Sequence, residues 1–334
     1  MARKPRKTEG QHFLLSAAAR SISLRSVMCM SDAEAWRVFQ DIRWAASVGK
    51  PVCPKCGSLS CYDIARNNRP RYRCRDCRTD YTPTSGTLFS YHKLSIREYL
   101  AAIVLFVNAV KGVSALQLGR DLDVSYKTAF VLCHKMREAM ASEMKGATAS
   151  GEVEIDGCHV GGYVKPANHK ENRRDRRKAE NQTGKRRVVV TIRDRVGRTI
   201  TSVFPSEDAS VDFIKARVAK GAVVHADEAA CWNALHARFA MKRINHQEAY
   251  SADGACTNGA ESYFSRLRRG EWGQYHHISG AYLARYAAEM AWREDHRRKP
   301  NGTLFTMVAA NAGNMGPSVD FCGYWQRSKP RQAA

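Results

Sequence analysis

The sequence lacks a run of about 18 apolar residues, which is the length that a helix needs to cross a membrane. Its apolar stretch at residues 99–110 is too short for that and is predicted to form a core helix instead. The basic start, MARKPRKTEG, is not followed by an apolar segment with a small-residue cleavage site, so no export signal is evident. We therefore expect a cytoplasmic protein without a membrane partner.

Acidic residues are scarce as well. The chain has 32 Asp and Glu against 54 Lys and Arg, which gives a formal net charge of +22. An excess of this size favours a polyanionic partner. With a membrane surface set aside, nucleic acid is the partner that this charge predicts.

Cysteine is present in an odd number, 11, which argues against a framework of disulfides in a chain that is not exported. Four of these residues form two CxxC pairs separated by 17 residues, Cys53 with Cys56 and Cys74 with Cys77. This spacing is typical of a zinc ribbon, and four thiolates leave no open position on the ion. We predict a structural Zn²⁺ here. Cys61, between the pairs, is the competing ligand and is interpreted as a core or surface thiol.

The second half of the predicted ribbon is rich in arginine and includes Arg69, Arg71 and Arg73. Two interpretations stay open for these side chains. The backbone held by zinc would present them to DNA phosphates, or they form a solvated basic face.

The region after the ribbon is predicted to be helical, with helices at residues 96–110, 114–122 and 126–140 and a short turn at 123–125. The last two helices have the layout of a helix-turn-helix, in which the N-terminal residues of the second helix face base edges in the major groove. An ordinary helical hairpin is the alternative. The candidate base-contacting residues are Ser125, Tyr126, Lys127 and Thr128.

A stretch of small residues at 145–151 is predicted to link this region to an α/β core. The core would hold a hairpin at residues 187–193 and 199–204, a crossover helix at 211–218, a further helix at 232–239 and a last strand at 241–244. The very polar residues 163–187 are predicted to be a mobile loop, which either follows a DNA backbone or is a solvated excursion. Its arginines include Arg173, Arg174, Arg176 and Arg177.

Three acidic residues occupy positions that suit a divalent-metal site. Short apolar runs at residues 153–155 and 222–224 are predicted to be buried strands that end near Asp156 and Asp227. Glu261 starts a helical pattern that follows a turn-like segment. Two divalent cations about 3.5–4 Å apart can hold the attacking and leaving oxygens of a phosphate, and carboxylates suit Mg²⁺ or Mn²⁺. Taken singly, each acid would more often be a solvated or capping carboxylate.

Several ordered motifs resemble those of a known family. The segments CPKCGS, IDGCHVGG, HADE, TNGAESYFSRLRRG and YHHISGAYLARYAAEMAWR are similar to those of the ISXO2-like transposases of the IS1595 group, from about residue 36 to about residue 297. The resemblance implies an RNase H-like core with a mixed five-stranded sheet and a DDE active site. It implies two Mg²⁺ or Mn²⁺ ions held by Asp156, Asp227 and Glu261. Arg268 would pair with a phosphate or with the third carboxylate, and Asn258 would support the third ligand or replace it.

The function that this resemblance implies is DNA transposition by an insertion sequence. The enzyme would bind terminal inverted repeats, cut at the ends of the element and join the freed 3′ hydroxyls to target DNA, as a homodimer or larger assembly associated with the nucleoid. A DNA-binding regulator with an inactive core and a hydrolytic nuclease on the same core are the alternatives. The expected domains are a basic segment (1–35), a zinc ribbon (36–92), a helix-turn-helix-like segment (93–147), the catalytic domain (148–298) and a C-terminal tail (299–334).

Overall fold

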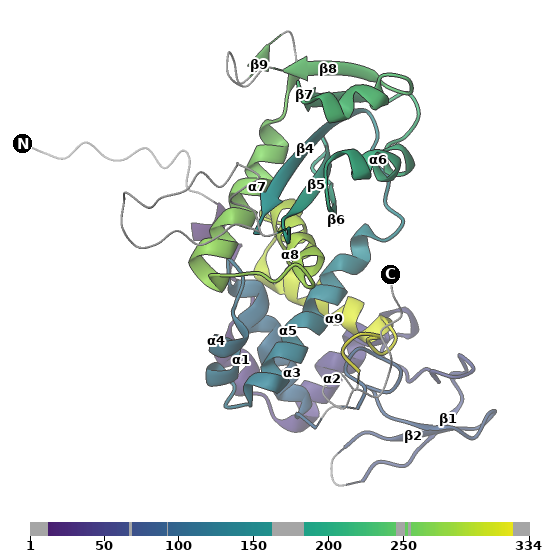
Figure 1. The fold of residues 1–334 in the computed structure, drawn as a ribbon. Coiled ribbons are helices and arrows are strands. Elements are labelled where there is room, and N and C mark those ends of the chain that lie inside the picture. Colours follow the sequence, from purple (N-terminus) through teal and green to yellow (C-terminus); the bar gives the residue numbers. More distant parts are fainter. Residues whose placement is uncertain are drawn as a thin grey trace, which may run out of the picture. The chain divides into compact units, whose positions relative to one another are not determined.

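The computed structural model describes residues 13–66, 69–91, 93–161, 184–244, 251–252 and 255–322 of the chain. These residues form two compact units (Figure 1). The first unit combines the chain up to Ala139 with the part from His296 onward, and the second unit runs from Met140 to Asp295. In the described part of the chain, no helix combines the length and the apolar character needed to span a membrane.

The first unit is built mainly from helices. They are α1 (Leu24–Met28), α2 (Asp32–Arg43), α3 (Ile96–Asn108), α4 (Ala115–Asp121), α5 (Tyr126–Ala141) and α9 (Asn301–Asn314). The apolar helix α3 is buried along most of its length and packs against α1, α2 and α9. Both α2 and α3 begin with a serine and, three residues later, a glutamate that cap the helix reciprocally. The helices predicted between residues 96 and 140 are confirmed to within two residues at each end.

Helix α9 lies in the segment that we expected to be a C-terminal tail. Its buried side chains recur at the spacing of a helix face, and they are Phe305, Val308, Ala309 and Ala312. The helix packs against α2 and α3. Residues 301–314 therefore belong to the helical unit, and the expectation of a tail is wrong for them.

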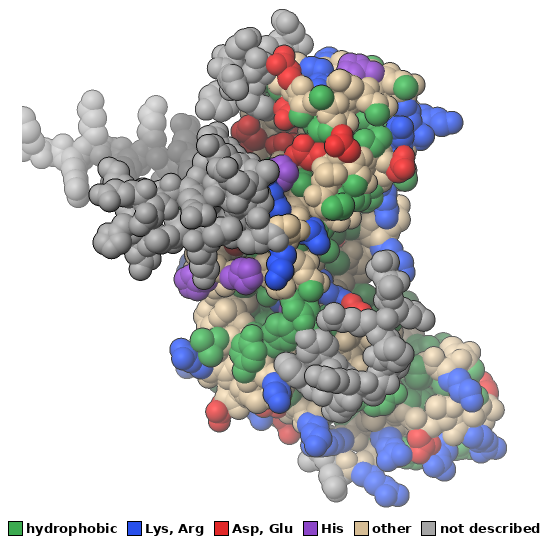
Figure 2. Space-filling model, viewed as in Figure 1, with side chains coloured by type: hydrophobic (Ala, Val, Ile, Leu, Met, Phe, Trp, Pro, Cys, Tyr) green, Lys and Arg blue, Asp and Glu red, His purple; other side chains and the backbone are tan. Residues whose placement is uncertain are grey.

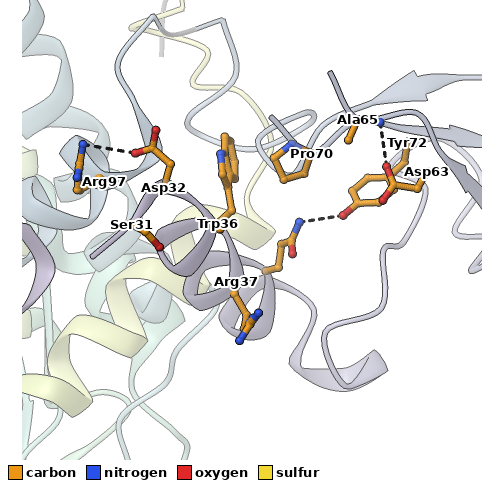
Figure 3. A pocket seen from close by; sticks show the side chains of 11 residues that line it. Ser31, Asp32, Trp36, Arg37, Asp63, Ala65, Pro70, Tyr72 and Arg97 are labelled. Atoms are coloured by element: carbon orange, nitrogen blue, oxygen red, sulfur yellow. Dashed lines mark hydrogen bonds and ion pairs between the residues drawn. The ribbon is translucent and has the colours of Figure 1, made fainter. Parts of the chain in front are cut away.

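The ribbon forms a three-stranded antiparallel sheet of β1 (Cys61–Asp63), β2 (Tyr72–Cys74) and β3 (Asp80–Tyr81), in that order. The ring of Tyr72 has Trp44 and Tyr81 as neighbours, with centroid distances of 6.0 and 5.6 Å. The Tyr72 hydroxyl accepts a hydrogen bond of 2.9 Å from Gln40 Nε2 on α2. Gln40 and Tyr72 both line a pocket between α2 and the ribbon (Figure 3). An aromatic core and a polar contact therefore both join the ribbon to the helices.

The second unit contains a mixed five-stranded sheet, as the resemblance implies. Its strands are β4 (Glu152–Val160), β5 (Arg187–Asp194), β6 (Thr199–Phe204), β7 (Val223–Asp227) and β8 (Ala240–Ile244). They lie in the order β6-β5-β4-β7-β8, where β4 pairs antiparallel with β5 and parallel with β7. A separate two-stranded ladder joins β9 (Ser251–Ala252) and β10 (Ala255–Cys256).

Three helices pack on the two faces of the five-stranded sheet: α6 (Val211–Arg217), α7 (Asn258–Gly270) and α8 (Leu283–Asp295) (Figure 1). On one face, Ile155 of β4 belongs to the same core cluster as α6. On the other face, Cys158 belongs to the cluster that includes α7 and α8. Because successive side chains of a strand point to opposite faces, Asp156 lies on the face that α7 covers.

Two elements differ from the sequence prediction. Strand β4 continues to Val160, so Asp156 lies in the interior of the strand and not at its end. The extension is stabilised by Cys158 and Val160, which are buried with α7 and α8. The helix predicted at residues 232–239 is a 3₁₀ helix, Ala230–Leu235. A 3₁₀ helix has three residues per turn, which places the buried side chains of positions 232 and 235 on one side.

Candidate active site

The sheet carries Asp156 and Asp227 on neighbouring strands, β4 and β7. Strands β4 and β7 run parallel, and Glu154 pairs with His225. This is the last pair of the ladder, and Asp156 and Asp227 each lie two residues beyond it on the α7 face. Both carboxylates are half-buried. The sheet therefore brings together two of the three predicted metal ligands.

Short local contacts orient these two carboxylates. Oδ1 of Asp227 accepts hydrogen bonds from Trp232 Nε1 at 2.7 Å and from the Ala229 amide at 3.3 Å. Trp232 is buried in the core cluster, so the 3₁₀ helix after β7 supplies a rigid donor. Oδ1 of Asp156 accepts a hydrogen bond of 2.7 Å from the Gly157 amide.

Glu261 comes from the first turn of α7. The helix is strongly amphipathic and buries the residues Ala260, Tyr263, Phe264 and Leu267. This apolar face packs against the sheet, and Glu261 lies half-buried at the N-terminal end of the helix. The helix therefore presents the third predicted ligand from an element that lies on the same face as Asp156.

The protonation of Asp156 reflects the presence of the other acids. Burial, together with the negative charges of Asp227, Glu207 and Glu261, raises the pKa of Asp156 to about 7, although the hydrogen bond from the Gly157 amide lowers it. These carboxylates are thus close enough to oppose the ionisation of Asp156, and a cation among them would relieve the repulsion. Figure 2 shows acidic side chains gathered over the part of the second unit that contains β7 and the start of α7.

Glu207 was not predicted from the sequence, and it lies beside this group. Its Oε1 is 3.6 Å from His159 Nε2, and its Oε2 accepts a hydrogen bond of 3.3 Å from Cys231 Sγ. The carboxylate fills the space next to Gly157, where a Cβ would lie 2.5 Å from Oε1. A glycine inside a strand often marks the close approach of another group, and Gly157 was the available signal.

Arg268 and Asn258 stand at opposite ends of α7. Burial raises the pKa of the Cys158 thiol, and the charge of Arg268 opposes that rise, so this exposed arginine lies near β4. The charge of Arg268 also lowers the pKa of Glu271, which burial raises. Asn258 is exposed at the first position of the helix, three residues before Glu261. The roles of both residues stay predictions.

The four predicted zinc ligands come together in the ribbon. The sulfur of Cys53 is 3.5 Å from that of Cys77, and the sulfur of Cys56 is 3.5 Å from that of Cys74. All four sulfurs lie within 4.8 Å of one another. A tetrahedral ion with Zn–S distances of about 2.3 Å needs sulfurs about 3.8 Å apart, so the geometry suits structural zinc. Within the described ranges, no other group of three or more His, Cys, Asp or Glu side chains brings its ligand atoms this close together. The ligand atoms of Asp156, Asp227 and Glu261 are therefore further apart than these sulfurs.

Two of the three ribbon arginines already have an acidic partner. Arg73 Nε is 2.6 Å from Asp80 Oδ1, and Arg71 lies 3.2 Å from Oδ2 of the same carboxylate. The register of β2 and β3 causes this, because it pairs Arg73 with Asp80. Arg69 is exposed. The lower part of Figure 2 shows many Lys and Arg side chains over the ribbon, with acidic ones among them.

The turn between α4 and α5 is compact. Gly119 of α4 lies so close to it that a Cβ there would be 3.1 Å from a backbone carbonyl of the turn. The hydroxyl of Ser125 accepts a hydrogen bond from the Thr128 amide at 3.3 Å and so caps α5. Ser125, Tyr126 and Lys127 are exposed and Thr128 is half-buried, whereas most of α5 beyond them is buried. The first turn is therefore the accessible part of the helix.

The predicted loop at residues 163–187 falls largely outside the described residues. Those described residues resume at 184, so the candidate DNA contacts Arg173, Arg174, Arg176 and Arg177 are among the positions not described.

Two solved structures match the chain at low similarity. The Mos1 strand transfer complex and a pre-cleavage Mos1 transpososome are each 10% identical to this chain over 67% of its length. The match covers 81% and 82% of the Mos1 chains, with TM-scores of 0.20 and 0.18. TM-scores at this level establish no common arrangement of the chains.

Sequence comparison identifies related proteins. An uncharacterized protein in the transposable element ISH50 of Halobacterium salinarum is 26% identical over 300 residues, which cover 85% of this chain and 97% of that protein. Residues 30–80 match the transposase zinc-ribbon domain, and residues 148–295 match the ISXO2-like transposase domain. The chain is therefore similar to ISXO2-like transposases in residues 148–295, which follow a segment similar to a transposase zinc ribbon in residues 30–80.

Proposed function

We propose that the protein is the transposase of an insertion sequence and that Asp156, Asp227 and Glu261 form its metal-dependent active site. The observation that supports this best is the position of Asp156, whose ionisation is opposed by the charges of Asp227 and Glu261. Asp156 and Asp227 lie on one face of a sheet, within the residues that match the transposase domain. Carboxylate oxygens are hard ligands that suit Mg²⁺ or Mn²⁺. These half-buried acids repel one another when they are ionised, and a bound cation would relieve that repulsion.

The proposed reaction has two steps. Water first attacks the phosphodiester at each end of the element and frees a 3′ hydroxyl. That hydroxyl then attacks a phosphodiester of the target DNA and displaces a target 3′ oxygen. Asp156, Asp227 and Glu261 would hold two divalent ions, which would supply activation of the attacking oxygen and stabilisation of the leaving oxygen. No covalent bond to the protein forms.

Residues of the chain hold this site in order. Trp232 and the Gly157 amide orient Asp227 and Asp156, which keeps one oxygen of each carboxylate fixed. Arg268 lies beside β4 and would meet a phosphate of the bound DNA. In the arrangement that we favour, Glu261 is the third ligand and Asn258, three residues before it on α7, supports it. The alternative is that Asn258 is itself the third ligand.

DNA recognition is proposed to use the first unit. The first turn of α5, with Ser125, Tyr126, Lys127 and Thr128, is the accessible end of an otherwise buried helix. A helix-turn-helix would place this turn against base edges of the terminal inverted repeats. The net charge of +22 would add attraction to the phosphate backbone. Pairing of two ends in one complex calls for a dimer or a larger assembly.

A strand-transfer assay with labelled end DNA, Mg²⁺ and a supercoiled target tests the proposed function. We expect products in which the end is covalently joined to the target. Cleavage without joining would indicate a nuclease instead. Binding without cleavage would indicate a regulator on an inactive core, and either result would refute the proposal.

Asp80→Asn is expected to tighten DNA binding if the ribbon contacts phosphates. The substitution frees Arg71 and Arg73 from their shared carboxylate. Each additional phosphate contact steepens the fall of log K with log salt by about 0.9, so we expect a slope steeper by about 1 to 2 and a several-fold gain in affinity at low salt. Binding is measured by fluorescence anisotropy of end DNA over a salt series.

The matched control is Asp76→Asn, which removes one exposed negative charge from the same ribbon without releasing the two arginines. An equal gain for both variants would assign the effect to net charge alone. No gain for Asp80→Asn would place the arginines on a solvated face away from the DNA.

A further inference from the structure

Glu154 is a buried carboxylate next to the acidic site that the proposed reaction does not use. It precedes Asp156 by two residues on β4 and therefore points to the same face, and it is only 4% exposed. A buried carboxylate costs several kcal/mol unless hydrogen bonds or opposite charges compensate it. The partners of Glu154 therefore indicate what it does.

The two oxygens of Glu154 join three other segments to the strand: α7, the turn after β5, and β10. Oε2 accepts a hydrogen bond of 2.9 Å from the amide of Ala260, in the first turn of α7. Oε1 is 3.3 Å from Arg195 Nε, just after β5, and 3.6 Å from Cys256 Sγ. The first amides of a helix have no partner within the helix and carry its positive dipole end, so an anion from the sheet anchors this end firmly.

The glycine before Ala260 gives a second, independent sign of this close seating. A Cβ on Gly259 would lie 2.8 Å from Glu154 Oε2 and 3.0 Å from two atoms of the Arg193 side chain. Both of these side chains are buried. The first turn of α7 therefore lies against β4 and β5 at a distance that only glycine permits.

We infer that Glu154 is a positioning residue that fixes Glu261 relative to Asp156. The residue that it holds, Ala260, directly precedes Glu261, so the hydrogen bond links the strand of the first acid to the turn of the third. This inference rests on the proposed function, since it takes Glu261 to be a metal ligand. Residues that orient metal ligands in this way change metal affinity by about 10–100-fold when they are replaced.

Mn²⁺ binding to the full-length, zinc-containing protein, measured by electron paramagnetic resonance, tests the inference without DNA. Glu154→Ala is expected to weaken Mn²⁺ binding by about 10-fold or more. Glu154→Gln keeps an oxygen that can accept from the Ala260 amide and is expected to stay within about 3-fold of the wild type, since only the charge is lost. Affinity for end DNA should be the same in all variants.

Glu152→Ala is the matched control. Glu152 lies on the same strand and face and also contacts Arg195, at 3.7 Å, but it is half-exposed and precedes the part of β4 that meets α7. A loss for Glu154→Ala no larger than that for Glu152→Ala would overturn the inference. Unchanged Mn²⁺ binding in Glu261→Ala would instead refute the ligand set of the proposed function.

Gly259→Ala provides the second variant in case Glu154→Ala does not fold. It leaves the carboxylate in place and pushes the first turn of α7 away from it, so the same weakening of Mn²⁺ binding is expected. Wild-type Mn²⁺ affinity in a folded Gly259→Ala protein would count against the inference.

Discussion

Asp156→Asn is expected to abolish cleavage and joining, by at least about 10³-fold, and at the same time to stabilise the metal-free protein. The loss of activity follows because Asp156 is the proposed ligand in the interior of β4, between the sheet and α7. Metal ions contribute several kcal/mol of stabilisation to developing charge, and about 4 kcal/mol corresponds to 10³-fold in rate. The joining assay measures this loss, and binding of end DNA should be unchanged.

The gain in stability has a definite dependence on pH. Burial, and then the charges of Asp227, Glu207 and Glu261, raise the folded-state pKa of Asp156 to about 7, against about 3.9 in an unfolded chain. A carboxyl group with a raised folded pKa contributes stability below the unfolded pKa, and this contribution is lost as pH rises through the folded value. Asparagine never ionises, so the variant avoids that loss.

Thermal unfolding at pH 8 without divalent ions should therefore occur at a higher temperature for Asp156→Asn. We expect a difference of about 1–3 kcal/mol, where each kcal/mol corresponds to about 2–4 °C. The difference should shrink as the pH falls and vanish near pH 4. Asp212→Asn, at an exposed position on α6, is the control and should unfold like the wild type. A less stable Asp156→Asn protein at pH 8, or retained joining, would contradict the assignment.

The sheet could be predicted from the sequence because its strands carry local signals. The hairpin of β5 and β6 appears within one residue of the predicted limits, since β-branched runs flank a glycine turn. The interior position of Asp156 could not be predicted in this way. Gly157 looks like the start of a turn, and only the distant α7 and α8, which bury Cys158 and Val160, show that the strand continues.

The partners of the acidic site are the part that one sequence conceals. Glu207 is far from Asp156 in sequence, and it reaches the site because the segment after β6 passes over Gly157. Glu154 looks like one more charge in a strand until its hydrogen bond to α7 is known. The pairing of Arg73 with Asp80 likewise depends on the register between two short strands. Each of these contacts is set by tertiary packing, on which local patterns carry little information.

Cys74→Ser is expected to remove the zinc and unfold the ribbon. Cys74 is fully buried at the end of β2, where it belongs to a small core with Trp44, Cys53 and Tyr81. That core is too small to hold three short strands without the ion, and structural zinc sites contribute about 10–16 kcal/mol to folding. We expect the bound zinc, measured by atomic absorption, to fall from about one ion per chain to near zero. Far-ultraviolet circular dichroism should show the loss of the ribbon strands.

Cys61→Ser is the control that distinguishes a zinc ligand from a thiol that only lies nearby. Cys61 pairs with Cys74 across β1 and β2 but is not one of the four clustered thiolates, so this variant should keep its zinc and its ribbon. Loss of zinc in Cys61→Ser would make that residue a ligand and would overturn the Cys53, Cys56, Cys74 and Cys77 assignment.

The second unit has its own core clusters, so Mn²⁺ binding at the acids should survive in Cys74→Ser. End-DNA binding that also survives would exclude the ribbon from the recognition surface, because its arginines keep their spacing only while the three strands remain folded.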